Sequence, residues 1–553
     1  MTKFIIITGG VMSGLGKGVV TSSLGKLLKS KGFSVSAIKI DPYLNCDAGT
    51  MNPFEHGEVF VLKDGTEVDL DLGNYERFLD TELQGIDNIT TGKVYRSVIE
   101  KERAGEYLGK TVQIIPHITD EINRRIWEVA DDTGVDIVLI EMGGTVGDIE
   151  SMPFLEASRQ LHMEVGEEKN NSLFIHTTLI PVLEVVGEQK TKPTQHSVKA
   201  LREIGIEPDI IVGRSENKLE KSTKQKISLF CDVPEEAVIS SPNADSIYRV
   251  PLILDDEGLT ERVMERLDLD ELLEEKEDTS IDPSHKMENW KNFLHGFENP
   301  TSEIDIALVG KYCDLEDAYV SHEQALNHCR AKTKTKINIE YVESEELEEE
   351  NGPEELLGDV DGILIPGGFG DRGTEGKINA INYARVNELP ILAICLGFQL
   401  SVVEFARNVL GYKEAHSFEF DEDTPDPVID LLPKQRGIDK MGGTMRLGAE
   451  NILVEEGTLA HNIYGKTEIS ERHRHRYEVN LDYKEEMESN GMKFSGYSLN
   501  EKRMEILEIE DHPFFIGSQF HPEFQSKSMK PAPLFLAFVN TILGQKEDPS
   551  DED

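Results

Sequence analysis

Long apolar stretches are missing from this chain of 553 residues. None approaches the roughly 18 residues that a membrane-spanning helix needs, and the chain does not start with the basic and then apolar pattern of a secretory signal. Cysteine is scarce as well, with five residues and no CxxC pair. A small, odd number of cysteines is typical of a reducing compartment, so we expect a cytoplasmic protein with no membrane partner.

Basic residues are also few, with 57 Lys and Arg against 104 Asp and Glu, a formal net charge of −47. This charge argues against nucleic acids and anionic membranes as partners. The acids are spread over the whole chain, apart from short runs at 343–350 and 546–553, whereas an acidic interaction surface would be clustered. Because molar salt shortens the screening length to about 3 Å, we interpret the composition as halophilic adaptation.

A candidate nucleophile follows the apolar stretch 390–394. Cys395 and the glycine two residues later predict a tight turn from a strand into a helix, which would lift the thiol into solvent. His521 could accept the thiol proton, and Glu523 could orient the imidazole if this stretch is extended. The alternative is a buried structural cysteine and a surface histidine; the flanking glycine and the His-Pro-Glu spacing favour a catalytic group.

These residues resemble the class I glutamine amidotransferases, which hydrolyse glutamine to glutamate and ammonia through a thioester. The resemblance implies Cys395 as nucleophile, His521 as base and Glu523 as orienting acid. Segment 365–370 resembles the oxyanion loop of that family, whose backbone N–H groups stabilise a developing negative oxygen. Ala393 replaces a usual glycine, and we expect it to be tolerated because its side chain is the smallest. The implied glutamine contacts are Gly368, Leu396, Gly397, Gln399, Glu419 and Arg476.

A second motif lies near the amino terminus. Residues 3–8 read as a buried strand, 9–18 as a glycine-rich loop and 19–30 as a helix, an order that makes an anion cradle of backbone amides. Lys17 should reach the β- and γ-phosphates of a nucleotide. Gly18 stands where a Ser or Thr usually binds Mg²⁺, so the metal must rely on carboxylates elsewhere.

Further unusual segments extend the resemblance to nearly the whole chain, residues 1–545. Together with the amidotransferase half, they resemble the CTP synthase family. The resemblance implies ATP-dependent phosphorylation of the 4-oxygen of UTP, followed by displacement of that phosphate by ammonia from glutamine. The segments are 37–43, 49–51, 56–59, 69–73, 140–150 and 187–197.

The resemblance also implies the nucleotide sites. Lys17 and Lys39, expected at the ends of adjacent strands, would neutralise the transferring phosphoryl group, and Asp71 and Glu141 would supply hard oxygen ligands to Mg²⁺. The ATP contacts would be Gly14, Leu15, Gly16, Lys17, Gly18, Val19, Lys39, Asp71, Arg214 and Asp245. The contacts to UTP, or to the product CTP, would be Ser13, Asp148, Ile149, Glu150, Lys190, Thr191, Lys192, Gln195 and Lys226.

Regulation and assembly follow from the same resemblance. It implies activation by GTP, feedback inhibition by CTP, a homotetramer with active sites between subunits, and an ammonia gate at 53–59. One alternative is an ATP-dependent amidase of the cobyrinic-acid type, which should lack the segment 190–197. Another is a catalytically inactive paralogue or a filament-forming scaffold; the complete set of triad, lysine and carboxylate residues argues against an inactive protein.

The expected fold class is α/β. Residues 1–268 alternate apolar and amphipathic stretches, which predicts a P-loop-type synthetase domain with a parallel sheet covered on both faces. We expect a linker with helical segments at 269–301, a class I glutamine amidotransferase α/β domain at 302–545 and a disordered acidic tail at 546–553. The histidines within 472–477 do not indicate a metal site, because the interleaved arginines would repel a cation.

The charge leads to a testable prediction. If the acids are halophilic adaptation, the melting temperature measured without nucleotides should rise steeply from low salt into multimolar KCl, because screening relieves repulsion over the whole surface. Without that adaptation the curve should be flat above about 0.2 M, where long-range repulsion is already screened. A flat curve would assign the acids to a partner or assembly surface.

Overall fold

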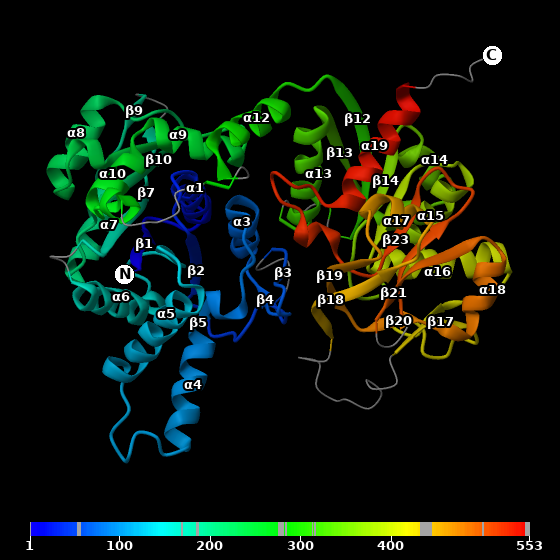
Figure 1. Cartoon of the computed structure of the whole chain (residues 1–553), viewed down its shortest axis with the longest axis horizontal. Helices are drawn as coiled ribbons and strands as arrows, with labels where there is room; N and C mark the ends of the chain where they lie inside the picture. Colours follow the sequence, from blue (N-terminus) through cyan, green and yellow to red (C-terminus); the bar gives the residue numbers. More distant parts are fainter. Residues whose placement is uncertain are drawn as a thin grey trace. The chain divides into compact units, whose positions relative to one another are not determined.

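In this computed structural model, the described residues are 2–51, 57–166, 170–183, 187–274, 281–282, 285–311, 313, 317–431, 445–499 and 503–547. The chain divides into two compact units (Figure 1). The first comprises Met1–Ala48 and Leu70–Lys291, and the second comprises Gly49–Asp69 and Asn292–Asp553. Among the described residues, no helix is long and apolar enough to cross a membrane.

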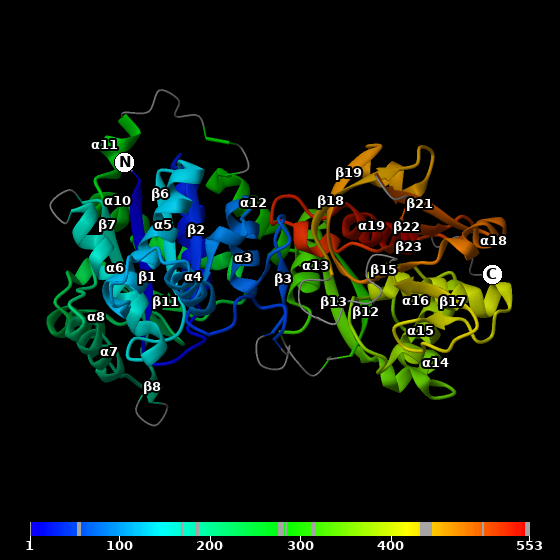
Figure 2. The same ribbon diagram turned by 90° about the horizontal axis from the view of Figure 1, so that it is seen from below.

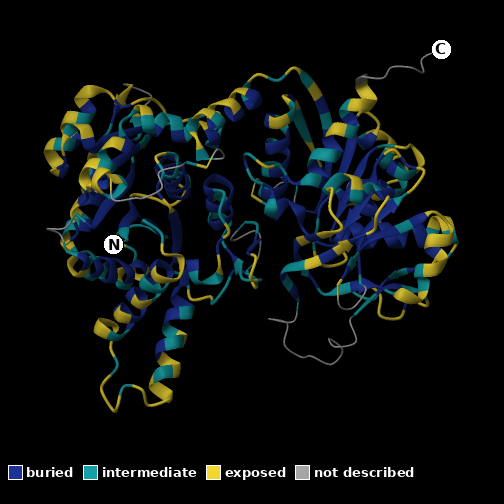
Figure 3. Ribbon diagram, in the orientation of Figure 1, coloured by how far each residue is buried: buried dark blue, intermediate teal, exposed yellow. Residues whose placement is uncertain are grey.

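The first unit contains a seven-stranded parallel sheet of order β11-β10-β7-β1-β6-β2-β5. Its central strands are apolar and buried along almost their whole length, as strands covered on both faces must be (Figure 3). The expected parallel sheet is therefore confirmed. The strands are β1 (Lys3–Gly9), β2 (Val35–Asp41), β5 (Asn88–Thr90), β6 (Ile137–Met142), β7 (Ser172–Leu179), β10 (Ile210–Ser215) and β11 (Val238–Pro242).

Helices cover both faces of this sheet (Figure 2). Helices α1 and α3 pack together on one face, and α5 and α6 pack together on the other. The helices are α1 (Lys17–Ser30), α3 (Leu70–Leu79), α4 (Thr91–Arg103), α5 (Thr119–Thr133), α6 (Met152–Val165), α7 (Lys192–Glu203), α8 (Lys221–Cys231), α9 (Val250–Asp256), α10 (Leu259–Arg266) and α11 (Leu269–Glu274). A short hairpin joins β8 (Val182–Leu183) and β9 (Glu188–Gln189).

One expectation about this sheet is wrong. Lys17 and Lys39 were predicted at the ends of adjacent strands, but β6 lies between β1 and β2, and Lys17 is the first residue of α1. The strand between them carries Glu141, which pairs in register with Ile7 of β1 and Lys39 of β2. A carboxylate therefore lies between the two predicted cations along the edge of the sheet.

The second unit contains a nine-stranded sheet of order β13-β12-β14-β15-β23-β22-β21-β18-β19. The first five strands are parallel and the remaining four antiparallel. They are β12 (Ser302–Gly310), β13 (Thr335–Glu343), β14 (Gly362–Ile365), β15 (Ile391–Ile394), β18 (Arg446–Val454), β19 (Glu468–His475), β21 (Met492–Ser498), β22 (Met504–Ile509) and β23 (Phe515–Ser518). A smaller sheet contains β16 (His416–Ser417), β17 (Pro427–Leu431) and β20 (Tyr477–Val479).

Two apolar clusters, one on each face of this sheet, form the core of the second unit. Residues of α15 and α16 belong to one cluster, and residues of α13 and α19 to the other. The helices are α13 (Val320–Thr333), α14 (Gly352–Leu357), α15 (Thr374–Val386), α16 (Leu396–Phe405), α17 (Leu459–Tyr464), α18 (Lys484–Ser489) and α19 (Pro533–Glu547).

The compact units differ from the expected domain ranges in two places. The expected linker contains α11 and α12 (Met287–Glu298), but the division between the units falls inside α12. Segment 49–69, expected in the first domain, belongs to the second unit. Its hairpin, β3 (Phe60–Val61) with β4 (Glu67–Val68), is held there by an edge-to-face contact between the rings of Phe60 and Phe524.

The carboxyl-terminal tail also differs in part from its prediction. Disorder was expected from residue 546, yet α19 continues to Glu547. Lys546 explains this extension, because its ammonium lies 2.6 Å from the Asp361 carboxylate. Residues 548–553 lie outside the described residues.

Candidate active sites

The glycine-rich loop between β1 and α1 has the geometry of an anion cradle. Gly14 and Gly16 have positive φ angles of 73° and 79°, which favour glycine, and Gly16 is the residue that precedes α1. The first N–H groups of a helix have no partner within it, so they can bind phosphate. Lys17 folds back over the loop and donates to the Gly144 carbonyl at 2.8 Å, and burial lowers its pKa.

A buried charge group lies at the same edge of the sheet. The ammonium of Lys39 donates to Glu141 Oε1 at 2.9 Å and also contacts the carboxylate of Asp71, at the start of α3. The Tyr75 hydroxyl donates to the other oxygen of Glu141. Burial raises the pKa of Glu141, while the nearby Lys39 charge opposes that shift. The structure thus brings the two predicted metal ligands to one cation.

Gly18 explains how this loop departs from the common phosphate-loop pattern. A Cβ added at Gly18 would collide with the carboxylate of Asp71, so Asp71 fills the space that a Ser or Thr side chain would need. Hard carboxylate oxygens suit Mg²⁺, which commonly binds one or two carboxylates together with substrate phosphates. Asp71 and Glu141, already converging on an ammonium, therefore fit a magnesium ion beside the cradle.

The segment expected to bind UTP gathers lysines from three elements. Lys190 follows β9 and pairs with Glu188 at 2.5 Å. Lys192 begins α7, and its ammonium lies 5.6 Å from the ring centroid of Phe230 on α8. Lys226 lies one helical turn before Phe230 and, like Lys190, lowers the pKa of Glu188. These lysines therefore form one basic cluster in a strongly acidic protein, with Lys192 and Lys226 exposed and Lys190 half-buried.

A chain of hydrogen bonds orders the start of α7. Lys192 donates to Gln195 Oε1 at 3.0 Å, and the Gln195 amide donates to the Thr191 hydroxyl at 3.0 Å. Thr191 itself is buried. The polar side chains predicted for the pyrimidine nucleotide thus contact one another.

The remaining residues predicted to bind nucleotides differ in burial and in their hydrogen bonds to the protein. Asp148 accepts hydrogen bonds from the backbone and hydroxyl of Thr145, at 2.7 and 2.8 Å, and so stabilises its own loop. Arg214 is half-buried and donates to Ser241 O at 3.2 Å. Val19 is half-buried and Leu15 is buried. Ser13, Ile149, Glu150 and Asp245 are exposed.

His176 was missed by sequence reasoning, although it links the two nucleotide segments. Its ring nitrogens lie 2.8 Å from the Thr8 hydroxyl, before the glycine-rich loop, and 2.7 Å from the Ser197 hydroxyl in α7. Burial lowers the pKa of His176 to about 4, with a further contribution from the Lys17 charge. A histidine inside an apolar strand gives no signal in a single sequence that separates this bridge from ordinary core packing.

In the second unit, Cys395 occupies a strained turn between β15 and α16. Its φ is 54° and its ψ −99°, an unusual conformation for a residue with a side chain. The expected exposure to solvent is wrong, because Cys395 is only 4% exposed. The thiol instead lines a cavity, where its sulfur lies 3.6 Å from the Arg474 carbonyl of β19.

His521 and Glu523 form the predicted pair. His521 Nδ1 lies 2.6 Å from Glu523 Oε1. The pair forms across the start of a 3₁₀ turn, Pro522–Gln525, rather than along an extended stretch. Burial acts to lower the pKa of His521, but the charges of Glu523 and Cys395 outweigh it and raise the pKa to about 10. Glu523 and Cys395 therefore increase the basicity of the imidazole, which lies between carboxylate and sulfur.

A cavity of about 800 Å³ surrounds these groups. Its wall includes Gly367 to Gly370, Glu419, Arg476 and the triad residues. Gln399 is buried and donates to Tyr477 O at 3.0 Å. Gly397 packs so closely that an added Cβ would lie 2.6 Å from Ile365 O, and Leu396 is buried beside Cys395.

Three further residues of the cavity wall were not predicted. Lys311 donates to the Phe369 carbonyl at 3.3 Å and to the Gly370 carbonyl, and burial lowers its pKa to about 8. His322 Nε2 lies 3.5 Å from Glu523 Oε1. Arg474 lies over the ring of Phe369, 5.0 Å from its centroid. Only the position of Arg474 in an unusual Arg-His-Arg-His-Arg stretch could have drawn attention to it.

Part of segment 49–69 also lines this cavity, through Gly49, Thr50, Met51, Glu58 and Val59. Glu58 anchors it, because its carboxylate accepts the Ser321 N–H at 2.7 Å and its own N–H donates to Asp317 O at 3.0 Å. Of the predicted gate, residues 53–56 lie outside the described residues. The described end of the predicted gate therefore lies against the cavity of Cys395.

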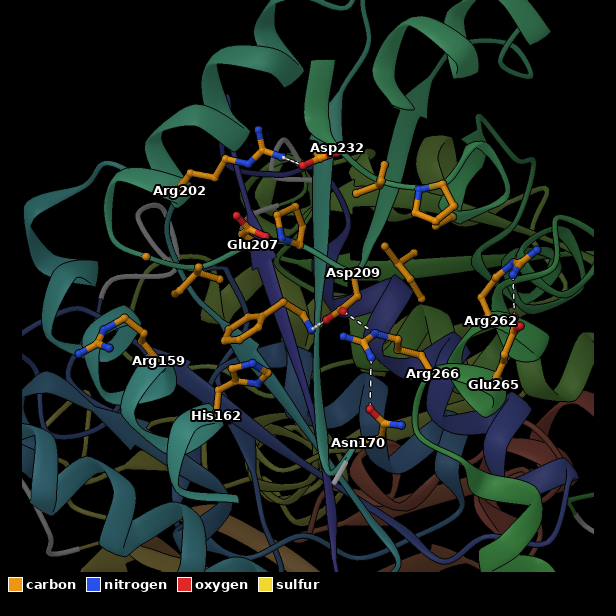
Figure 4. Close-up of a pocket in the computed structure, with 18 of the residues that line it drawn as sticks. Arg159, His162, Asn170, Arg202, Glu207, Asp209, Asp232, Arg262, Glu265 and Arg266 are labelled. Atoms are coloured by element: carbon orange, nitrogen blue, oxygen red, sulfur yellow. Dashed lines mark hydrogen bonds and ion pairs between the residues drawn. The ribbon is translucent and has the colours of Figure 1, made fainter. Parts of the chain in front are cut away.

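Another cavity, of about 760 Å³, lies at the amino ends of β7, β10 and β11 (Figure 4). Its arginines are paired with acids: Arg266 lies 2.7 Å from Asp209 and Arg262 2.7 Å from Glu265. The predicted nucleotide residues are absent from its described lining. Because ligands of parallel sheets bind at the carboxyl ends of the strands, this cavity is not the expected nucleotide site.

Comparison with known proteins identifies the family. Residues 3–269 match the family described as CTP synthase N-terminus, and residues 314–541 match glutamine amidotransferase class-I. The CTP synthase of Archaeoglobus fulgidus is 56% identical over 546 residues, covering 99% of each chain. The CTP synthase of Haloarcula hispanica is 57% identical over 550 residues, covering 99% of this chain and 96% of the relative.

A solved structure, the glutaminase domain of Trypanosoma brucei CTPS with bound acivicin, is 39% identical. The match covers 44% of the present chain and 94% of the Trypanosoma brucei domain, with a TM-score of 0.42. The full-length relatives carry out the glutamine-dependent amination of UTP to CTP. With both family models matched in order and more than half of its residues identical over nearly its full length, the chain belongs to the CTP synthase family.

Proposed function

We propose that Cys395 hydrolyses glutamine in the second unit and that Lys17, Lys39, Asp71 and Glu141 activate UTP in the first. The observation that carries the glutaminase assignment is the geometry at Cys395. A nucleophile at positive φ between a strand and a helix lies in one cavity with a His–Glu pair whose facing atoms are 2.6 Å apart.

The glutaminase steps follow from these positions. His521, oriented by Glu523, accepts the thiol proton as the sulfur attacks the γ-amide carbon of glutamine. The oxyanion that forms would accept hydrogen bonds from the backbone N–H groups of Gly367 and Leu396. Leu396 is the first residue of α16. His521 then gives its proton to the leaving nitrogen, and ammonia departs. Water hydrolyses the thioester to glutamate and restores the thiol.

The synthetase steps use the first unit. The 4-oxygen of UTP attacks the γ-phosphorus of ATP, and ADP leaves. Ammonia then attacks carbon 4 of the uracil, and phosphate leaves to give CTP. Lys17 and Lys39 neutralise charge on the transferring group, and Asp71 and Glu141 would hold Mg²⁺, which would neutralise phosphate charge when bound.

The substrate contacts carry over as part of this proposal. In the first unit, ATP would contact Gly14, Leu15, Gly16, Lys17, Gly18, Val19, Lys39, Asp71, Arg214 and Asp245, and the pyrimidine nucleotide would contact Ser13, Asp148, Ile149, Glu150, Lys190, Thr191, Lys192, Gln195 and Lys226. In the second unit, glutamine would contact Gly368, Leu396, Gly397, Gln399, Glu419 and Arg476. The clustering of Lys190, Lys192 and Lys226 supports a shared triphosphate site for UTP and CTP.

Regulation and assembly belong to the proposal as well. GTP would activate the enzyme, and CTP would inhibit it by competing with UTP for the lysine cluster. Nucleotides that bridge subunits would favour a homotetramer. A cytoplasmic location is supported by the sparse cysteines. The net charge of −47 supports adaptation to high salt.

The glutaminase assignment is tested by Cys395→Ala. Glutamine-dependent CTP formation should disappear, whereas ammonia-dependent formation should stay near the wild-type rate, because only the ammonia source needs the sulfur. Both activities are measured from the absorbance of the pyrimidine product in high salt. Loss of both in a folded variant would contradict the two-site scheme.

The phosphoryl centre is tested by Gly18→Ala. The added Cβ must displace Asp71, and a displacement of about 1 Å can cost about 10²-fold in rate. CTP formation should fall by that order from either nitrogen source, while glutamine hydrolysis persists. Gly544→Ala is the matched control, since an added Cβ there meets nothing within 4 Å. CTP formation at the wild-type rate in Gly18→Ala would contradict the role of Asp71 in phosphoryl transfer.

The ammonia route is tested at Val59, which is buried and lines the cavity of Cys395. A sheltered route is needed because ammonia in neutral water is mostly ammonium, which is not nucleophilic. Val59→Phe should reduce glutamine-dependent CTP formation more than glutamine hydrolysis, so that glutamate accumulates in excess of CTP. Val59→Ala, which removes bulk, is the control. An equal decrease of both rates in Val59→Phe would count against a route past Val59.

A further inference from the structure

Lys377, on α15, is a fully buried lysine close to the glutaminase centre. Its side chain is 0% exposed, and its ammonium donates to the Pro366 carbonyl at 3.0 Å. Burial lowers the pKa of Lys377 to about 7. Burying an ammonium is costly, so a lysine at this position needs a reason beyond packing. The partner it meets belongs to the loop that precedes Gly367.

The contact fixes the orientation of one peptide group. In a planar trans peptide, the Pro366 carbonyl and the Gly367 N–H point in opposite directions. With the carbonyl directed at Lys377, the Gly367 N–H is directed away from α15. Gly367 lies over the catalytic pair, since an added Cβ would be 3.0 Å from His521 Cε1 and 3.4 Å from Cys395 Cβ. The peptide that carries this N–H therefore lies next to the catalytic pair.

The far end of the loop is held in the same way. Lys311 donates to the Phe369 carbonyl at 3.3 Å, and the Gly370 N–H of the same peptide group donates to Glu419 Oε1 at 3.2 Å. Two ammonium groups thus bind loop carbonyls on either side of Gly367 and Gly368. Glycines impose little conformational preference of their own, so these anchors set the direction of each peptide.

We propose that Lys377 is a positioning residue that keeps the Gly367 N–H directed at the oxyanion formed on glutamine. Without the ammonium, the Pro366–Gly367 peptide can rotate and turn its carbonyl oxygen toward the developing negative charge, which would repel it. Lys377 itself does not touch the substrate. The inference rests on the proposed glutaminase function of Cys395 and adds the residue that orients its electrostatic stabiliser.

The test is Lys377→Met, which keeps a long unbranched side chain and removes the donor. Since the oxyanion exists only during the reaction, glutaminase kcat should fall, by up to the about 10²–10³-fold that the loss of one oxyanion donor costs. The KM for glutamine should change by less than about threefold. Lys332→Met, an exposed lysine on α13, is the matched control and should retain wild-type rates.

A second readout separates positioning from general damage. The γ-aldehyde analogue of glutamine adds the Cys395 thiol across its C=O bond to give a tetrahedral adduct, with the thiol proton transferred by way of His521. Lys377→Met should weaken this adduct in proportion to the loss in kcat, while ammonia-dependent CTP formation remains. Unchanged kcat, or a KM that rises as much as kcat falls, would overturn the proposal.

Loss of ammonia-dependent CTP formation together with glutaminase activity would show that Lys377→Met does not fold. In that case the aldehyde adduct of the wild-type protein tests the proposal. Its crystal structure should have Lys377 on the Pro366 carbonyl and the Gly367 N–H on the adduct oxygen, and a rotated peptide would overturn the proposal. Cys395→Ala separates a failure of the positioning role from a failure of the proposed glutaminase function. If that variant is inactive toward glutamine and Lys377→Met is not impaired, only the positioning role fails.

Discussion

The ammonium of Lys39 holds together the charged centre of the first unit. Two carboxylates from different elements, the half-buried Asp71 and the buried Glu141, contact it, and like charges this close together are stabilised by a cation between them. Asp71 reaches this position only because residue 18 is a glycine. The unusual phosphate loop and the carboxylate pair are therefore one arrangement, in which a side chain from α3 replaces the hydroxyl that the loop lacks.

The second unit also places charged groups close together, and different residues stabilise them. The sulfur, imidazole and carboxylate of its proposed triad are all buried, and each charge has a partner of opposite sign or a carbonyl. Lys377 and Lys311 bind the loop carbonyls, while Glu523 and Cys395 raise the pKa of His521. In both units the groups that we propose to be reactive lie at the carboxyl ends of parallel strands, where loops and helix starts converge.

Local patterns were enough to predict much of this. The apolar strands, the glycine-rich loop and the sequence around Cys395 specify their own conformations, so the parallel sheet of the first unit, the glycine-rich cradle and the turn at Cys395 follow from short segments. The pairing of His521 with Glu523 was also predicted, although the backbone between them is a 3₁₀ turn. Separation by two residues permits contact in either conformation.

Features that depend on distant packing could not be predicted. The order of strands placed β6 between β1 and β2, and the burial of Cys395 involves β19, 79 residues away along the chain. Lys377 looks like any helical lysine until the loop above it is known. Segment 49–69 joins the second unit through contacts such as the ion pair of Glu67 with Arg474 at 2.8 Å, which no local pattern encodes.

We propose that ATP phosphorylates the 4-oxygen of UTP beside Lys39, Asp71 and Glu141 before ammonia arrives. The most direct measurement uses UTP labelled with ¹⁸O at that oxygen, together with ATP, Mg²⁺ and ammonia in high salt. The label should appear in inorganic phosphate, one atom for each CTP formed. Label released into water, with unlabelled phosphate, would mean that ammonia displaces the oxygen directly, and it would contradict the account.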